Sequence, residues 1–296
     1  MPLNSVEIDR VDDLDRETFR KTYLKTRTPV VVKNLAKSWP AYTKWNFEYF
    51  KSVAGDQTVP LYDGSKTDGT KKVNEPDTTM KFADYLDLIA REPSQLRIFL
   101  FNIVSHMPDV KKDYTNPPYC DWFVDQFPAL FFGGGGSSVF MHYDIDAPSI
   151  FHTHFVGRKR VTLVSPKYTP LMYKLPLSWH AIEDIDWRNP DYEKFPALRG
   201  VTAHTTILEH GETLYMPKGW WHFMEYLDGS FSISLRALVS PAQVAEAAWN
   251  VGVVKTVDNF FRKRRGKDWF VWKESKAMEK SNRLAEKMKL VAPVSA

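Results

Sequence analysis

Residues 136–144 read GSSVFMHYD, and residues 215–222 read YMPKGWWH. Apolar and β-branched residues in the first stretch favour a strand. His142 and Asp144 lie two residues apart on it, and residues i and i+2 of a strand project from the same face. His222 ends the second stretch, 80 residues after His142, so a strand that folds back can place it beside this pair. The two stretches therefore supply two imidazoles and one carboxylate that can converge on one ion.

Two imidazoles and one carboxylate on one face of a metal are the ligand set of non-haem iron(II) oxygenases. The His-x-acid pattern alone is not specific, because eight histidines and 36 acidic residues predict roughly one chance match in a chain of this length. The chain contains a second match, His210-Gly211-Glu212. Gly211 favours a turn before the next strand rather than a rigid pair of ligands. The candidate metal ligands are therefore His142, Asp144 and His222.

The composition is that of a globular, enzyme-sized chain of 296 residues, 43% hydrophobic and 26% charged, with no run of 18 apolar positions. These values exclude collagen-like, disordered and transmembrane classes for the bulk of the sequence. A net charge of +4 is too small to imply nucleic-acid binding across the whole surface. Cys120 is the single cysteine, so a metal must use histidine and carboxylate. The N-terminal residues lack the pattern of a secretory signal, and we expect a cytoplasmic protein without membrane contact.

Three patterns divide the chain into a helical and strand entry at 1–95, a β core at 96–240 and a helical tail at 241–296. In the entry, helical spacing from Asp9 precedes a β-branched strand at Pro29–Lys33, and Met80–Arg91 is again helical. Short apolar segments between turn residues in the core are typical of an antiparallel sandwich or barrel. The further predicted strands are Val59–Tyr62 within the polar loop Asp56–Asp77, Arg97–Phe101, Val139–Tyr143, Ser149–Val156, Arg160–Val164, Thr205–Leu208, Thr213–Met216, Trp221–Tyr226 and Phe231–Leu238.

The tail is predicted to be two helices. Apolar residues recur at spacings of three and four from Val244 to Phe261, which indicates an amphipathic helix, and Lys273–Lys289 is a second, highly charged helix. The basic run Arg262–Lys267 is interpreted as a solvated helix end, because cations complement the dipole there. Nucleic acid is therefore an unlikely partner on sequence grounds.

The segment from Phe131 to Leu238 resembles the double-stranded β-helix, a jelly roll, of JmjC and cupin-like 2-oxoglutarate oxygenases. Within that family it is similar to the asparaginyl hydroxylase that inhibits hypoxia-inducible factor. The stretches that carry the resemblance are Gly136–Asp144, Gly157–Arg160 with Leu163 and Pro166, Asn189–Pro196 continuing to His222, and Pro29–Val32 with Trp39-Pro40. The expected fold is mainly β with flanking helices around this core.

The resemblance implies a cofactor, a cosubstrate and a reaction. His142, Asp144 and His222 would hold Fe(II), and Lys159 would pair with the distal carboxylate of 2-oxoglutarate. An anion that enters a partly dry barrel needs a fixed countercharge, and a charge-assisted hydrogen bond to lysine meets that need. The cosubstrate would chelate the iron and O2 would take the last position. The implied product is a hydroxylated side chain of a protein or peptide, or of a small molecule, with release of succinate and CO2.

The sequence departs from the relative at positions around the cosubstrate. Ile150 and Arg236 stand where the relative has amide side chains, and Val139 stands where it has a hydroxyl, with Ser138 beside it. Ser138 and Arg236 are therefore candidate cosubstrate contacts. Arg236 can meet a carboxylate through a bidentate fork, or it can form a structural ion pair.

Several other residues have two interpretations. His152 and His154 lie two residues apart on one predicted strand. Each is interpreted either as a hydrogen-bonded histidine of the barrel or as a substrate contact. His204 is interpreted as structural, and Trp220 and Trp221 as core and rim packing. In the relative the C-terminal helices form a homodimer, so the resemblance favours the same use of the amphipathic helix here.

The leading function is an Fe(II)- and 2-oxoglutarate-dependent oxygenase. A cupin-like binding or scaffold protein without turnover is the alternative, because Val139 and Ile150 are apolar at positions that the relative keeps polar. A metal-dependent cupin enzyme that does not use 2-oxoglutarate is a third possibility. The substrate itself and the choice between hydroxylation and demethylation are not encoded in any motif.

Overall fold

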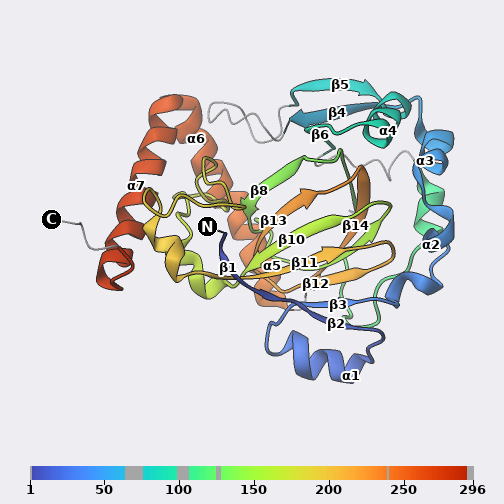
Figure 1. Ribbon diagram of the computed structural model, residues 1–296, viewed down its shortest axis with the longest axis horizontal. Coiled ribbons are helices and arrows are strands. Elements are labelled where there is room, and N and C mark those ends of the chain that lie inside the picture. Colours follow the sequence, from blue (N-terminus) through green and yellow to red (C-terminus); the bar gives the residue numbers. More distant parts are fainter. Residues whose placement is uncertain (1, 64–75, 99–106, 125–127, 239, 292–296) are drawn as a thin grey trace.

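Eight strands between residues 129 and 237 form two sheets that face each other (Figure 1). The structure, a computed structural model, describes residues 2–63, 76–98, 107–124, 128–238 and 240–291. The eight strands are β7 (Ala129–Gly133), β8 (Ser138–His142), β9 (Ser149–Phe155), β10 (Lys159–Val164), β11 (Thr202–Leu208), β12 (Thr213–Met216), β13 (Trp221–Tyr226) and β14 (Ser230–Ala237).

One sheet orders these strands β12-β9-β14-β7, and the other orders them β11-β10-β13-β8. Their pairing is antiparallel throughout, and most consecutive strands lie in opposite sheets. This alternation is the connectivity of a jelly roll, in which two Greek keys wind around one core. The predicted mainly β fold with a double-stranded β-helix core is confirmed.

Strands from the N-terminal part extend both sheets. β1 (Asn4–Glu7) lies parallel to β11, while β2 (Asp9–Val11) and β3 (Val30–Val32) continue the other sheet beyond β12. At the opposite edge, β4 (Thr58–Asp63), β5 (Thr78–Lys81) and β6 (Leu96–Arg97) lie beyond β7. The short helices of the N-terminal part are α1 (Arg16–Phe19), η1 (Arg20–Leu24), η2 (Leu35–Ser38), α2 (Ala41–Lys44), α3 (Phe47–Ala54), α4 (Phe82–Arg91) and η4 (Pro108–Lys112). Two further short helices, η5 (Pro166–Leu171) and η6 (Pro196–Gly200), lie within the core.

Aromatic residues fill the space behind the larger sheet. Phe50, Phe132 and Phe231 are fully buried and pack ring against ring with centroids 5.0–5.3 Å apart. Each ring removes a large apolar area from water, and such pairs add about 0.5–1.5 kcal/mol beyond that burial. All seven residues of β9 are buried, because helices cover one face of its sheet and the second sheet covers the other. The larger sheet, which carries Arg236, is therefore packed on both faces.

Of the C-terminal helices, α6 and α7 lie at one end of the sandwich, on the left of Figure 1, while α5 lies beside the strands. They are α5 (Pro241–Trp249), the π-helical turn η7 (Asn250–Val254), α6 (Lys255–Arg265) and α7 (Lys267–Lys287). Ser240 caps α5 by accepting a hydrogen bond from the Gln243 amide, and Gly266 separates α6 from α7 with a φ of 52°. Among the described residues, none of the helices combines the length and apolar character that a membrane span requires.

Most predicted core strands coincide with observed ones, within a few residues at their ends. The entry differs from the prediction, because Asp9 begins strand β2 rather than a helix, and β1, β5 and β7 were not predicted. The predicted tail helix Val244–Phe261 is interrupted by η7. The predicted loop Asp56–Asp77 and strand Arg97–Phe101 lie partly outside the described residues.

Candidate metal centre

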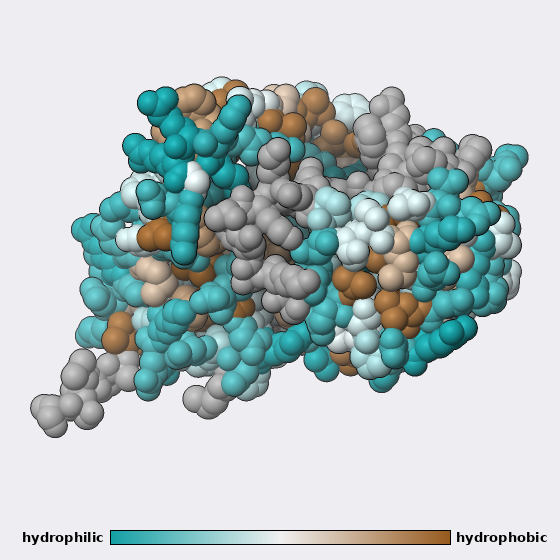
Figure 2. Space-filling view, turned by 90° about the horizontal axis from the view of Figure 1, so that it is seen from above, coloured by the Kyte–Doolittle hydropathy of each residue, from teal (hydrophilic) through white to brown (hydrophobic). Residues whose placement is uncertain are grey.

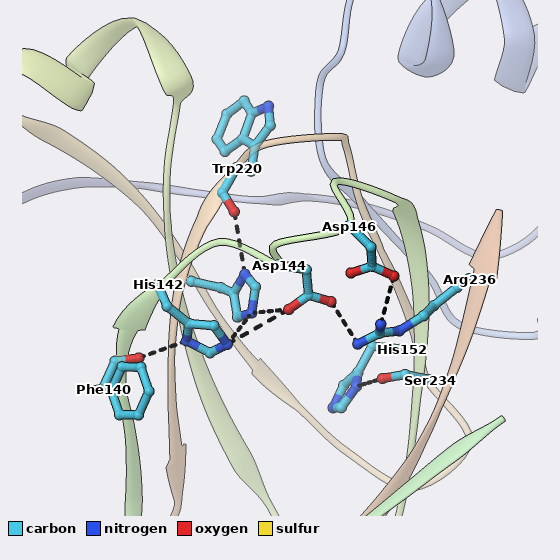
Figure 3. A network of polar contacts seen from close by, with 9 residues as sticks. Phe140, His142, Asp144, Asp146, His152, Trp220, Ser234 and Arg236 are labelled. Carbon is cyan, nitrogen blue, oxygen red and sulfur yellow. Dashed lines mark hydrogen bonds and ion pairs between the residues drawn. The ribbon is translucent and has the colours of Figure 1, made fainter. Parts of the chain in front are cut away.

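Adjacent strands bring the two candidate histidine ligands together. His142 is the last residue of β8 and lies directly opposite His222 of β13. Their Nε2 atoms are 3.1 Å apart, and Asp144, just beyond β8, places Oδ1 3.7 Å from each of them. Within the described part of the chain, this is a group of histidine and acidic side chains whose ligand atoms all lie within 4.8 Å of one another. The three predicted ligands therefore share one site (Figure 3).

Backbone carbonyls orient both imidazoles. His142 Nδ1 lies 2.8 Å from the carbonyl oxygen of Phe140, and His222 Nδ1 lies 3.2 Å from that of Trp220 (Figure 3). Each Nδ1–H donates to its carbonyl, which fixes the tautomer and leaves the Nε2 lone pair facing the centre. Both rings therefore present a metal-binding nitrogen.

Burial sets the charge states of the three groups. It lowers the pKa of His142 to about 3, with His222 as a second cause, and it also lowers the pKa of His222. For Asp144, burial acts to raise the pKa, but Arg236 and the two imidazoles outweigh it and the pKa is lowered. Neutral imidazoles beside an ionised carboxylate are the donor set that suits a divalent iron.

Arg236 of β14 binds one of the two Asp144 carboxylate oxygens, and the other oxygen faces the histidines. Its Nη2 donates to Asp144 Oδ2 and its Nη1 donates to Asp146 Oδ2, both at 2.8 Å (Figure 3). Asp144 Oδ1 is the oxygen that faces the histidines, so the arginine and a metal would engage opposite oxygens. Arg236 thus forms the structural ion pair. Its predicted contact with the cosubstrate stays a prediction, for which the buried Nε, unpartnered within the described residues, is the remaining donor.

Lys159 of β10 is a buried cation inside the barrel, with an exposed fraction of 1%. Its Nζ donates to Ser232 Oγ at 2.7 Å, lies 3.3 Å from His152 Nε2 and sits 4.1 Å above the centre of the Tyr226 ring. Burial lowers its pKa well below the usual value. Across the described ranges no carboxylate is paired with it, so an incoming anion would supply the missing countercharge.

The glycine run before β8 shapes this end of the barrel. A Cβ on Gly133 would lie 2.7 Å from the ring of Tyr226, which is closer than real Cβ contacts. Glycine therefore lets the Tyr226 ring pack against β7 and remain below the Lys159 ammonium.

One cavity of about 770 Å³ contains both the metal ligands and Lys159. Its lining from the sandwich includes Phe131, Val139, Ile150, His152, Met216, Met224, Tyr226, Ser234 and Arg236, and its lining from loops and from α6 includes Ile145, Asp146, Ser178, Trp179, His180, Lys255, Asp258, Asn259, Arg262 and Lys263. The residues from the loops and from α6 were not predicted as site residues. His180 forms an isolated β-bridge with His142. It lies in a long irregular segment, where the sequence has no periodic pattern that would predict its place at the site.

Ser138 is not among the residues that line the cavity. A register shift in the β8–β13 pairing sets His142 opposite His222 but Val139 opposite Met224, so two residues of β8 lie between these pairs against one of β13. This bulge turns Val139 to the cavity and pairs Ser138 with Glu225. The structure therefore does not bring Ser138 to the site, in contrast to the prediction for it.

The remaining histidines divide between cavity and packing. His152 lines the cavity and its Nδ1 lies 2.7 Å from Ser234 Oγ, whereas His154 is held by Ser232 and the Gly157 carbonyl. His210 lies in a turn, as predicted, where Gly211 has a φ of 81°. His204 packs edge-on against Trp220, and Trp220 and Trp221 are both buried.

A sequence model described as "Cupin-like domain" matches residues 16–237. The chain belongs to this family. The matched range of the cupin-like domain contains the three candidate ligands and Lys159, and it ends before the C-terminal helices.

The cupin-like domain is also similar to curated proteins. It is 28% identical over 235 residues to "Lysine-specific demethylase 8" of Danio rerio, which covers 77% of this chain and 57% of that protein. It is 30% identical over 247 residues to "Lysine-specific demethylase JMJ30" of Arabidopsis thaliana, with 79% and 56% covered. The chain spans little more than half the length of these relatives.

A third relative is named for a different activity. The chain is 28% identical over 246 residues to "tRNA wybutosine-synthesizing protein 5" of Gallus gallus, covering 74% of this chain and 73% of that protein. These relatives place the chain among JmjC and cupin-like proteins, while the finer resemblance to an asparaginyl hydroxylase stays a prediction.

Proposed function

We propose that this chain is an Fe(II)- and 2-oxoglutarate-dependent oxygenase that hydroxylates a carbon of a macromolecular substrate, with release of succinate and CO2. The observation that carries the proposal is the placement of two converging imidazoles, one carboxylate and one buried lysine in a single cavity. The names of the relatives, two demethylases and a tRNA-modifying protein, support a macromolecular substrate.

The residues of the chain would do distinct tasks. His142, His222 and Asp144 Oδ1 would hold the iron, and Lys159 would hold the distal carboxylate of the cosubstrate. Iron with 2-oxoglutarate and O2 supplies the oxidation, which no side chain can perform. The surrounding apolar wall, including Val139, Ile150 and Met224, excludes water from the bound cosubstrate.

Succinate release tests the proposal. Purified protein with Fe(II), ascorbate and 2-oxoglutarate should release succinate, and His142→Ala and Asp144→Ala should each abolish that release. His210→Ala is the matched control, because His210 belongs to the second His-x-acid match but lies in a turn on the surface. Succinate release that persists in both ligand variants would refute the ligand assignment.

Calorimetry separates the oxygenase from the alternatives. An oxygenase should bind 2-oxoglutarate far more tightly when the metal is present, since the cosubstrate contacts both the metal and Lys159. A scaffold protein should show little dependence on metal. A metal enzyme that does not use 2-oxoglutarate should show no binding at all, and Lys159→Ala should not change its activity.

We also propose that the chain forms a homodimer through its C-terminal helices. Trp249 and Phe260 are 61% and 57% exposed, and Val253 and Val257 are exposed beside them on η7 and α6. Exposed apolar side chains gathered on one helical segment are typical of an interface. Light scattering should give twice the chain mass for the wild type and the single mass for Trp249→Asp with Phe260→Asp.

A further inference from the structure

Helix α6 forms part of the lining of the cavity that holds the metal ligands. Lys255, Asn259, Arg262 and Lys263 line the cavity together with Asp258. Their spacing of four, three and one residues places them on one face of the helix. Ile145 and Trp179 from the core line the same cavity. A substrate that enters this cavity therefore meets a helix from the tail.

The charges at this mouth do not cancel. Asp258 is buried and accepts hydrogen bonds from Lys273 at 2.9 Å and from Trp269, and Arg262 lies 3.3 Å from it. Deeper in the cavity, Asp144 and Asp146 are both paired with Arg236. Within the part of the chain that the structure describes, no ion pair engages Lys255 or Lys263. The mouth therefore keeps an excess of positive charge.

The positive charge continues beyond the mouth. Residues 255–291 contain 12 lysines and arginines and five aspartates and glutamates, a formal charge of +7, although the whole chain carries only +4. Figure 2 shows hydrophilic side chains projecting at the end of the molecule where α6 and α7 lie. A basic stripe along a helix beside an active site is the electrostatic footprint of a polyanion.

An aromatic ring at the same mouth favours nucleic acid over an acidic peptide. Trp179 is half-buried and lines the same cavity as the α6 cations, within the segment that also contributes Ser178 and His180. Carboxylates of a peptide would use only the cations. A nucleotide would use both, with phosphate on lysine and arginine and its base stacked on the indole.

We infer that the substrate is a single-stranded segment of nucleic acid, whose phosphates lie along α6 and whose target base enters the cavity past Trp179. This inference rests on the proposed oxygenase function for its chemistry. A single strand is required because a base in a duplex is stacked and paired, and must leave the helix before an enzyme can reach it. The basic run Arg262–Lys267 thus has a second use besides complementing the helix dipole, through the position of Arg262 and Lys263 on the cavity wall.

Fluorescence anisotropy with labelled oligonucleotides tests the inference. The probes are a mixed-sequence single-stranded RNA, a DNA of the same sequence, the corresponding RNA duplex and polyglutamate. We expect both single strands to bind, with the RNA and DNA arms showing which sugar is preferred, and the duplex and polyglutamate to bind at least about tenfold more weakly. Tighter binding of the duplex or of polyglutamate would overturn the inference, as would the absence of binding to either single strand.

Paired charge variants locate the binding surface. Lys255→Glu with Lys263→Glu should weaken single-strand binding roughly tenfold or more and reduce the slope of log K against log salt by about 1.4, since each phosphate contact on a single strand contributes about 0.7. Lys21→Glu with Lys25→Glu is the matched control, because it makes the same change in net charge on exposed residues of the distant entry segment. Lys255→Arg with Lys263→Arg should retain binding. Equal losses in the α6 pair and the control pair would overturn the assigned surface.

The stacking role of Trp179 has a separate signature. Trp179→Ala should weaken binding roughly five- to hundredfold without changing the salt slope, because stacking releases no counterions. An unchanged affinity would contradict the stacking of a base on Trp179.

Failure of this proposal differs from failure of the proposed function. Intact succinate release without oligonucleotide binding contradicts only the proposed substrate. Oligonucleotide binding without any succinate release contradicts only the proposed oxygenase activity.

Discussion

At the scale of single residues, the site depends on how Asp144 is held. Its Oδ1 faces His142 and His222, and its Oδ2 receives a hydrogen bond from Arg236. The arginine also neutralises Asp146, which would otherwise repel Asp144 across the same loop. The carboxylate is therefore oriented before any metal arrives, and it stays ionised because Arg236 and the two imidazoles together outweigh the cost of burial.

Replacement of Arg236 should weaken metal binding. Arg236→Met leaves two neighbouring carboxylates without their cation and frees Asp144 to rotate, so we expect a 10- to 100-fold loss of Mn(II) or Fe(II) affinity, which is roughly the usual effect of removing such a partner. Arg236→Lys should recover part of the loss. Arg158→Met is the control, because Arg158 forms an exposed ion pair with Asp228 on the surface. Metal titration followed by calorimetry would decide, and equal affinities in all four proteins would contradict the role.

Binding of 2-oxoglutarate should take up protons through Lys159. Burial lowers the pKa of this ammonium well below its usual value, so a fraction of Lys159 is neutral in alkaline solution. An anionic carboxylate beside it raises that pKa again and favours the charged form. The affinity should therefore be greatest at lower pH and fall as the pH rises through the pKa of the free protein. Calorimetry in buffers with different ionisation enthalpies measures the uptake, and binding that never exchanges a proton would contradict the prediction.

At the scale of elements, the loop after β8 is fastened by the tail. Ala147 in this loop has a φ of 46°, a left-handed conformation that is costly for a residue with a side chain. Its carbonyl accepts a hydrogen bond from buried Gln243 of α5 at 2.7 Å, and the Ile145 carbonyl accepts one from Asn250 of η7 at 3.0 Å. The loop that carries Asp144 and Asp146 thus depends on helices that lie outside the matched family range.

Removal of the Gln243 contact should loosen this loop. Gln243→Ala leaves a buried carbonyl without its donor, which costs about 1–3 kcal/mol of stability. We expect a lower melting temperature together with weaker metal binding, whereas Gln95→Ala, at an exposed position, should change neither. A loss of stability without any change in metal affinity would show that α5 does not position the ligand loop.

The sequence predicted the parts of the fold that are local. The strands around His142 and His222 have apolar runs bounded by turn residues, and the i, i+2 spacing of His142 and Asp144 needs no distant information. Other features depend on partners far away in the chain. β1 is polar and exposed, and it is a strand because it pairs with β11. The bulge that turns Val139 rather than Ser138 to the cavity arises in the pairing with β13. For the same reason the position of α6 at the cavity could not be read from its charges.

At the scale of the whole molecule, the candidate site connects the two sheets. The histidines belong to the sheet that contains β8 and β13, while Asp144 is held by Arg236 from β14 of the opposite sheet. An ion bound by all three ligands would therefore link segments that are distant in sequence. Such a link acts on the native state, since the unfolded chain does not hold the ligands together.

Metal should raise the thermal stability of the whole protein. At a hundredfold excess of free metal over its dissociation constant, binding to the native state adds about 2.7 kcal/mol, which corresponds to a rise of roughly 4 °C in the melting temperature. The rise should vanish after addition of a chelator and in Asp144→Ala, but persist in His210→Ala. Scanning calorimetry of the three proteins measures it, and an equal rise in Asp144→Ala would exclude this site as its origin.

The core and the tail contribute different parts of the candidate site, and this has an evolutionary consequence. The ligands and Lys159 come from the sandwich, whereas one side of the entrance is a helix that follows the family domain. Mutations in α6 would therefore change which molecules the cavity admits without changing the candidate ligands or Lys159. Homologues with nearly identical barrels but divergent tails would then be expected to modify unrelated targets, and grafting one tail onto another barrel offers a direct route to exchanging them.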